Sequence, residues 1–300
     1  MKVGSPQLDA LRTGFNSSFQ KGYAGAPSHW ASVAMKINSS NASETYGWMG
    51  QLPSLREWIG DRVIKNLAEH SYSVKNRKFE TTITVQRADI EDDRIGLYAP
   101  LFQELGRAAA EHPDELVFGL MAAGFATPCY DGQYFFDTDH PVGRPDGSTI
   151  SVSNFGGGTG TAWYLLDTSR PMKPMIFQER IPYALQRVDN DQNERVFLRD
   201  EYLFGVRARV NAGFGLWQLA YASKRPLDAT NYAAARVAMA SLTSDEGRPL
   251  GIRPDTLVVP PALEQQALQL IQNELLINAG VAVSNEWKGT AKLIVMPWLS

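Results

Sequence analysis

The sequence predicts an α+β protein built from a long helix, a long pair of strands and a smaller α/β unit towards the C-terminus. Three patterns predict it. Residues 78–86 alternate between polar and apolar, which is typical of a half-buried strand. Residues 93–123 place apolar side chains three and four positions apart, which is typical of a helix. Residues 175–223 contain two β-rich stretches, and helical and strand patterns alternate after residue 226.

The composition narrows the class of protein. The chain has 300 residues, of which 44% are hydrophobic and 20% charged, so it can fill a core of ordinary size. Its net charge of -3 provides no broad basic surface for gripping nucleic acid. We expect neither a secretory signal, because the first residues contain no apolar stretch, nor a membrane span, because no run of about 18 apolar residues occurs. A single cysteine excludes an internal disulfide and a zinc site with several thiolates, and it favours a reducing cytosol.

Residues 1–47 predict an arm. They are rich in Ser, Asn and Gly, and their apolar residues occur singly. A short amphipathic helix is expected where four apolar residues have helical spacing: Leu8, Leu11, Phe15 and Phe19. The rest of the arm is expected to be extended. Such a segment buries too little of itself to be stable alone, so it is either disordered or laid across another surface.

Residues 48–92 predict a β-hairpin without a local core. The strand at 78–86 directs Phe79, Thr81, Ile83 and Val85 to one face. The stretch "YSVKN" just before it is the expected partner. Because an isolated two-stranded hairpin is marginal in water, this one needs a platform that the nearby sequence does not supply.

A long helix is predicted over residues 93–123. Asp92 and Asp93 suit its N-terminus, where acidic side chains cap free N–H groups. Pro113 predicts a kink or a break, and Gly124 is the expected stop signal.

Two strands, 175–188 and 196–223, predict a long hairpin across the polar run "DNDQNE". Pro182 indicates an edge or a bulge in the first strand. The glycine-rich stretch at 154–161 lacks the ending of a phosphate loop and the spacing of a dinucleotide loop, so a flexible surface loop is expected.

The C-terminal part predicts two helices and two strands. A helix is expected at 231–242, a buried strand at 256–259 and a final strand at 291–299. Pro260 and Pro261 open the second helix. Its apolar stripe is expected to consist of Leu263, Ala267, Leu270, Ile271 and Leu275.

The stretch "YDGQYFFDTDHPVG", residues 130–143, has the residue types of a catalytic or metal site. Asp137, Asp139 and His140 could bind a metal ion. However, the chain has only four histidines, none paired at ligand spacing, and the loop lacks the further acids of a calcium site. The favoured interpretation is a polar turn, because Asp, Thr and Gly are common in turns.

Cys129 and His140 could also form a nucleophile and its base. Nothing in the sequence orients them, so a buried, inert thiol is favoured. The three aromatic residues Tyr134, Phe135 and Phe136 are expected to enter the core. We therefore predict no catalytic, cofactor-binding or metal-binding residue, no cofactor, and no enzyme activity.

Several long stretches resemble the major head (capsid) subunits of bacteriophage Mu and Mu-like prophages, a family of the Hong Kong 97 type. The matching stretches extend over nearly the whole chain: residues 45–60, 90–116, 128–142, 164–180, 200–205, 257–267 and 283–289. Ordered matches of this length are more specific than any short motif.

The resemblance implies a Hong Kong 97-type capsid fold. It assigns residues 1–47 to an N-terminal arm and 48–92 to an extended E-loop whose platform is a neighbouring subunit. Residues 93–225 become a peripheral domain with a spine helix, and 226–300 an axial domain. Aromatic and large apolar residues dominate contact cores, so Trp48, Trp58 and Ile59 are candidate anchors between subunits.

The implied function is a structural one. Many copies would assemble into an icosahedral shell of hexamers and pentamers that encloses double-stranded DNA without reading its sequence. A scaffolding protease and a portal are the implied assembly partners. The implied location is the virion capsid, and the host cytoplasm during assembly. Two alternatives remain at this stage: a related nanocompartment (encapsulin-like) shell that holds a cargo enzyme, and a hydrolase that uses Cys129, His140 and the two Asp residues.

Overall fold

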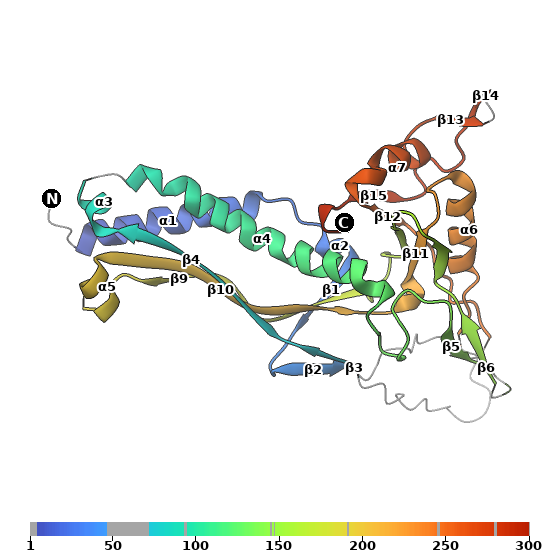
Figure 1. Ribbon diagram of the computed structural model, residues 1–300, viewed down its shortest axis with the longest axis horizontal. Helices are drawn as coiled ribbons and strands as arrows, with labels where there is room; N and C mark the ends of the chain where they lie inside the picture. Colours follow the sequence, from blue (N-terminus) through green and yellow to red (C-terminus); the bar gives the residue numbers. More distant parts are fainter. Residues whose placement is uncertain are drawn as a thin grey trace.

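The computed structural model describes residues 5–46, 72–92, 95–144, 146, 148–190, 192–244, 247–278 and 281–299. The molecule is elongated: helices and long strands run side by side to a more compact unit at the other end (Figure 1). The α-helices are α1 (Ser5–Gly25), α2 (Trp30–Val33), α3 (Arg87–Glu91), α4 (Ala99–Ala122), α5 (Glu194–Arg199), α6 (Ala229–Ala240) and α7 (Glu264–Ile271). No helix within these ranges is both long and apolar enough to cross a bilayer.

The strands are distributed over the whole chain. The first eight are β1 (Ala34–Asn38), β2 (Ser43–Tyr46), β3 (Tyr72–Lys75), β4 (Arg77–Gln86), β5 (His140–Gly143), β6 (Thr149–Val152), β7 (Phe155–Gly158) and β8 (Trp163–Leu166). The others are β9 (Met175–Val188), β10 (Glu201–Phe214), β11 (Ala220–Lys224), β12 (Thr256–Val259), β13 (Leu275–Asn278), β14 (Val281–Ser284) and β15 (Lys292–Val295).

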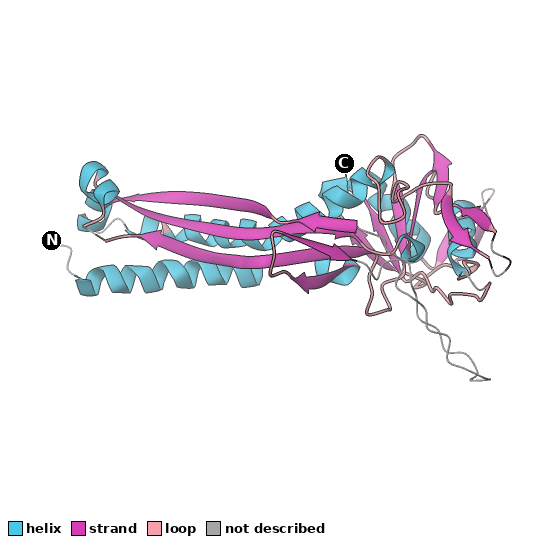
Figure 2. Ribbon diagram, turned by 90° about the horizontal axis from the view of Figure 1, so that it is seen from below, coloured by secondary structure: helices cyan, strands magenta, loops and turns pink. Residues whose placement is uncertain are grey.

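A four-stranded sheet in the order β1-β9-β10-β4 forms the extended part of the molecule. The strands β9 and β10 make the predicted antiparallel hairpin (Figure 2). The pairing shifts register between Arg207 and Arg209, opposite Pro182, and this irregularity confirms the predicted bulge. The second strand is shorter than predicted. Residues 194–199 form helix α5 at the turn, and 220–224 leave the hairpin as β11.

The predicted hairpin between residues 72–76 and 78–86 is wrong. The strand β4 exists, but it pairs with β10, whereas β3 pairs with β2. Only Asn76 separates β3 from β4, and one residue is too short to turn a hairpin. Its side-chain amide donates to Ser39 Oγ and the Asn41 carbonyl, which holds the crossing in place. The platform for β4 is therefore this chain's own sheet. Trp48, Trp58 and Ile59 lie outside the described residues.

The helices α1 and α4 cover one face of this sheet (Figure 1). The predicted arm helix is confirmed and is longer than its apolar stripe suggested. It packs closely on α4, because a Cβ added at Gly22 or at Gly106 would lie 1.9 or 2.1 Å from the backbone of the other helix. Phe15 stacks on Phe102 at 4.2 Å between ring centroids. The arm is thus laid across a surface of its own chain.

The helix α4 starts later than predicted and is not broken. Asp92 closes α3 through its N–H instead of capping α4, and Pro100 lies in the first turn of α4, where a missing N–H costs little. The helix runs through Pro113 to Ala122. Gly124 does not adopt a left-handed stop conformation. A glycine is needed there because the chain passes close to Phe136: a Cβ at position 124 would lie 2.8 Å from the Phe136 ring.

The compact end contains a five-stranded sheet in the order β15-β12-β8-β11-β7, with α6 and α7 beside it. The predicted helix at 231–242 and strand at 256–259 are present. The final strand is shorter than the predicted 291–299, because β15 ends at Val295 and residues 297–299 form a 3-10 turn. Leu275 is not part of the α7 stripe: it is 58% exposed and begins β13. The strands β7, β8 and β11 precede residue 225 and share one sheet with β12 and β15, so a continuous boundary at that residue divides a single sheet.

The glycine-rich stretch is not a free loop, because β7 forms one edge of that sheet. A Cβ at Gly156 would lie 2.6 Å from Tyr221 Oη. At Gly158, which has φ of +95°, a Cβ would lie 2.4 Å from the Lys224 backbone. The glycines therefore allow the edge strand to pass close to β11.

Candidate functional site

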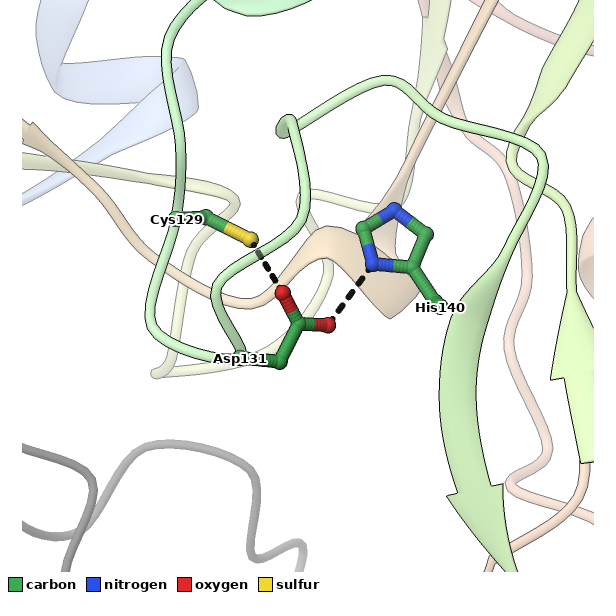
Figure 3. A group of neighbouring side chains, drawn as sticks. All are labelled: Cys129, Asp131 and His140. Atoms are coloured by element: carbon green, nitrogen blue, oxygen red, sulfur yellow. Dashed lines mark hydrogen bonds and ion pairs between the residues drawn. The ribbon is translucent and has the colours of Figure 1, made fainter. Parts of the chain in front are cut away.

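The loop between α4 and β5 brings three chemically active side chains together (Figure 3). Cys129 Sγ lies 3.0 Å from Asp131 Oδ1, and His140 Nδ1 lies 2.7 Å from Asp131 Oδ2. A tight turn makes this possible: Gly132 has φ of +87°, and the Gln133 N–H donates to Asp131 Oδ1. Cys129 and His140 are buried, and the Asp131 side chain is only 5% exposed.

The His140 ring is held on two further sides. It stacks on Trp217 with ring centroids 4.0 Å apart and planes 10° apart. Its Nε2 faces Asn154 Oδ1 at 3.2 Å. The orientation of the Asn154 amide is fixed, because its Nδ2 donates to backbone carbonyls of Phe135, Trp217 and Ala220. Asn154 Oδ1 also accepts the Asp137 N–H.

The electrostatics make Cys129 a poor nucleophile. Burial raises the pKa of the Cys129 thiol, and the neighbouring Asp131 carboxylate raises it further. Burial alone would also raise the pKa of Asp131, but hydrogen bonds from His140, Cys129 and Gln133 outweigh it and keep that pKa below its usual value. The thiol donates to Asp131, and His140 Nδ1 faces the same carboxylate. The Cys129–His140 pair expected of a hydrolase is therefore replaced by a carboxylate with a partner on each side.

The acids singled out in the sequence lie outside this cluster. Asp139 is exposed, and the Asp137 carboxylate accepts the N–H groups of Tyr134 and Thr138, as predicted for a turn. Phe135 and Phe136 are buried as predicted, whereas the prediction for Tyr134 is wrong because it is 47% exposed. In the sequence, Asp131 is only one residue of the polar turn predicted for residues 130–143. Its second role, as the hydrogen-bond partner of Cys129 and His140, could have been suspected from one pattern: an Asp-Gly pair close to the only cysteine.

Exposed apolar side chains gather on helical segments at the far end of the molecule. At this end Phe197 is 80% exposed, Leu97 70%, Leu198 68% and Leu101 51%, while Val237 and Leu275 are exposed in α6 and β13. Phe197 and Leu198 belong to α5, at the turn of the β9–β10 hairpin (Figure 1). Leu97 ends a 3-10 turn just before α4, and Leu101 lies in the first turn of α4. Large apolar side chains that stand exposed at one end of a subunit are candidates for contacts with other proteins.

Two solved structures of a phage head share this architecture. The chain matches a subunit of the procapsid of bacteriophage JBD30 with a TM-score of 0.87 and 46% identity, covering 99% of this chain and 100% of that one. The JBD30 capsid matches with a TM-score of 0.77 and 36% identity, with both chains fully covered. The spine helix, the long hairpin and the compact α/β end thus define a phage capsid protein of the Hong Kong 97 type.

The family follows from the sequence comparisons. The sequence family described as "Mu-like prophage major head subunit gpT" matches residues 8–299 of this chain. The chain is 48% identical to the Mu-like prophage FluMu major head subunit of Haemophilus influenzae, over 97% of each chain. It is 45% identical to the major capsid protein of Escherichia phage Mu over the full length of both. This chain belongs to the Mu-like major head subunit family, a family of structural capsid proteins. Its function is that of the major capsid protein of a Mu-like phage.

Proposed function

We propose that the chain assembles, as hexamers and pentamers, into an icosahedral head shell that encloses double-stranded DNA. The observation that carries the proposal is the apolar far end of the molecule, where Phe197 and Leu198 are 80% and 68% exposed. A well-packed subunit that leaves such side chains exposed is suited to contacts with further copies of itself. The net charge of -3 fits a container that does not bind its DNA by sequence.

The division of the subunit is part of the proposal. Residues 1–47 are the N-terminal arm and 48–92 contain the E-loop. The peripheral domain holds α4 and the β9–β10 hairpin. We place the axial domain in two stretches, because β7, β8 and β11 pair in one sheet with β12 and β15. A scaffolding protease and a portal are the proposed partners during assembly in the host cytoplasm. In this proposal the chain itself has a structural role and no catalytic one.

The double substitution Phe197→Ser with Leu198→Ser tests the assembly surface. Both side chains are exposed in the subunit, so we expect its thermal unfolding temperature to stay unchanged. Sedimentation and electron microscopy should show loss of closed shells. Arg195→Ser is the matched control, since Arg195 is exposed on the same helix, and it should assemble normally. Shells of normal yield and size from the double variant would contradict the proposal.

A further inference from the structure

We propose that Cys129, Asp131 and His140 form a binding site for a single zinc ion. These three side chains offer a thiol sulfur, a carboxylate oxygen and an imidazole nitrogen, all within 4.8 Å of one another. Thiolate, imidazole and carboxylate are the usual ligands of Zn²⁺ in proteins, at about 2.0–2.3 Å from the metal. Donors around one such ion stand roughly 3–4 Å apart, so the cluster needs only small side-chain movements to receive it.

The second ring nitrogen of His140 supports a metal at the first. The Asn154 amide presents an oxygen to Nε2, and an oxygen accepts but cannot donate, so Nε2 carries a hydrogen. In the neutral ring the lone pair then lies on Nδ1, which is directed at Asp131 and Cys129. A ligating histidine in proteins almost always donates its other N–H to a fixed acceptor. The stack on Trp217 holds the ring in that orientation.

The charge of the cluster also suits an exchange of protons for zinc. Both ring nitrogens meet acceptors, so without metal a proton lies between Nδ1 and Asp131 Oδ2, and another is on the Cys129 sulfur. Zn²⁺ displaces these two protons and leaves a thiolate, a carboxylate and a neutral imidazole. The net charge of this buried group does not change, so the exchange avoids the cost of burying an unbalanced charge. The remaining tetrahedral position is available to a water molecule or to the second Asp131 oxygen.

Zinc at this position would join two segments of the compact end. Cys129 and Asp131 lie in the loop that leaves α4, and His140 begins β5. The metal would close the loop that carries the buried Phe135 and Phe136, beside the end of α4. Its role would be structural, because metal–ligand bonds would link the two segments that the hydrogen bonds of Asp131 now hold together.

Spectroscopy with Co²⁺ in place of Zn²⁺ tests the site on the full-length chain, both as free subunits and as shells. We expect the ligand-field bands of a tetrahedral site and a thiolate-to-cobalt charge-transfer band. Since the chain has one cysteine, that band can come only from Cys129. Because protons leave as the metal binds, affinity should increase with pH, by up to about 100-fold per unit while both are displaced. Added Zn²⁺ should displace the cobalt spectrum and raise the thermal unfolding temperature.

Cys129→Ser separates a metal site from a network of hydrogen bonds. The serine hydroxyl can still donate to Asp131, so the variant should fold, but it provides no thiolate. We expect it to lose the charge-transfer band and the zinc-dependent rise in unfolding temperature. Asp139→Asn, an exposed acid in the same loop, is the matched control and should keep both. The proposal is overturned if the wild-type chain shows no thiolate band and no zinc-dependent stabilisation, or if Cys129→Ser is stabilised by zinc to the same extent.

Discussion

At the scale of single residues, Asp114 is a buried carboxylate with a structural task. It lies on α4 and is 3% exposed, and its oxygens accept the backbone N–H groups of His29 and Trp30 at the start of α2. Asp114→Ala leaves these donors buried without a partner, so we expect the free energy of unfolding to decrease by about 2–3 kcal/mol. Urea denaturation of the subunit measures it. Glu115→Ala, at the exposed neighbouring position, should change stability by less than about 0.5 kcal/mol.

His112 should make the subunit less stable in mild acid. Burial lowers the pKa of His112, and Arg77 lowers it further, while Glu115 opposes them. The unfolded chain, with a histidine pKa of about 6.5, therefore binds a proton more readily than the folded one. Stability is complete above that pH and decreases as the pH falls from there towards the lower folded pKa. Unfolding temperatures at pH 7.5 and 5.5 should differ less in His112→Gln than in the wild type. An identical pH dependence in both proteins would show that His112 is not responsible.

The residues around the Cys129 cluster show what sequence patterns can and cannot specify. The buried Phe135 and Phe136 were predictable, because two adjacent aromatic rings need cover. The role of Asp131 was not, since it depends on Gly132 turning the chain and on Asn154 and Trp217, which fix His140 from other parts of the chain. Asp137 and Asp139 looked equally suitable in the sequence. Their side chains lie outside the cluster only because the folded chain directs them away from it.

At the scale of elements, the contact between α1 and α4 depends on two glycines. A Cβ at Gly106 would lie 2.1 Å from the Phe19 carbonyl oxygen, so Gly106→Ala forces the helices apart. We expect a loss of about 1–3 kcal/mol, as for other overpacked interfaces. Gly119→Ala lies in the same helix with nothing within 4 Å, and should instead stabilise by up to about 1 kcal/mol through helix propensity. Chemical denaturation of both variants tests the pair. Equal effects would indicate that α1 can shift without cost.

Strand existence was predictable from the sequence, but strand pairing was not. The alternation at 78–86 identified β4, and the two long β stretches identified β9 and β10. Alternation shows which face is buried and does not show which neighbour supplies the hydrogen bonds. The true partner of β4 is more than 100 positions further along the chain, at Glu201–Val210. The shortest loop is therefore a poor guide when a single residue such as Asn76 carries the chain from one sheet to another.

At the scale of the whole molecule, the arm is part of the subunit's own core. Phe15 and Phe19 are 2% and 1% exposed, and they pack with Phe102, Leu105 and Phe204 far from the compact end. Phe15→Ala should therefore lower the free energy of unfolding by about 3–5 kcal/mol. Limited proteolysis should then cut first at the far end of the molecule. Asn16→Ala, at the exposed next position, is the control. A Phe15→Ala subunit of normal stability would mean that the arm is dispensable before assembly.

The long sheet exchanges one edge strand for another at a single level. The strand β1 pairs only with residues 175–179 of β9, and β4 only with residues 201–210 of β10, so four strands lie abreast in a single row at Val210. The bulge opposite Pro182 begins beside that row. Tyr183 meets His112, so Pro113, which removes one hydrogen bond from α4, lies at the same level. The regular hydrogen bonding of both the sheet and α4 is therefore interrupted at this level. The subunit can thus adjust the angle between its two ends at this level, where the hydrogen bonding is irregular, and a closed shell of uniform subunits needs such an adjustment wherever its curvature changes.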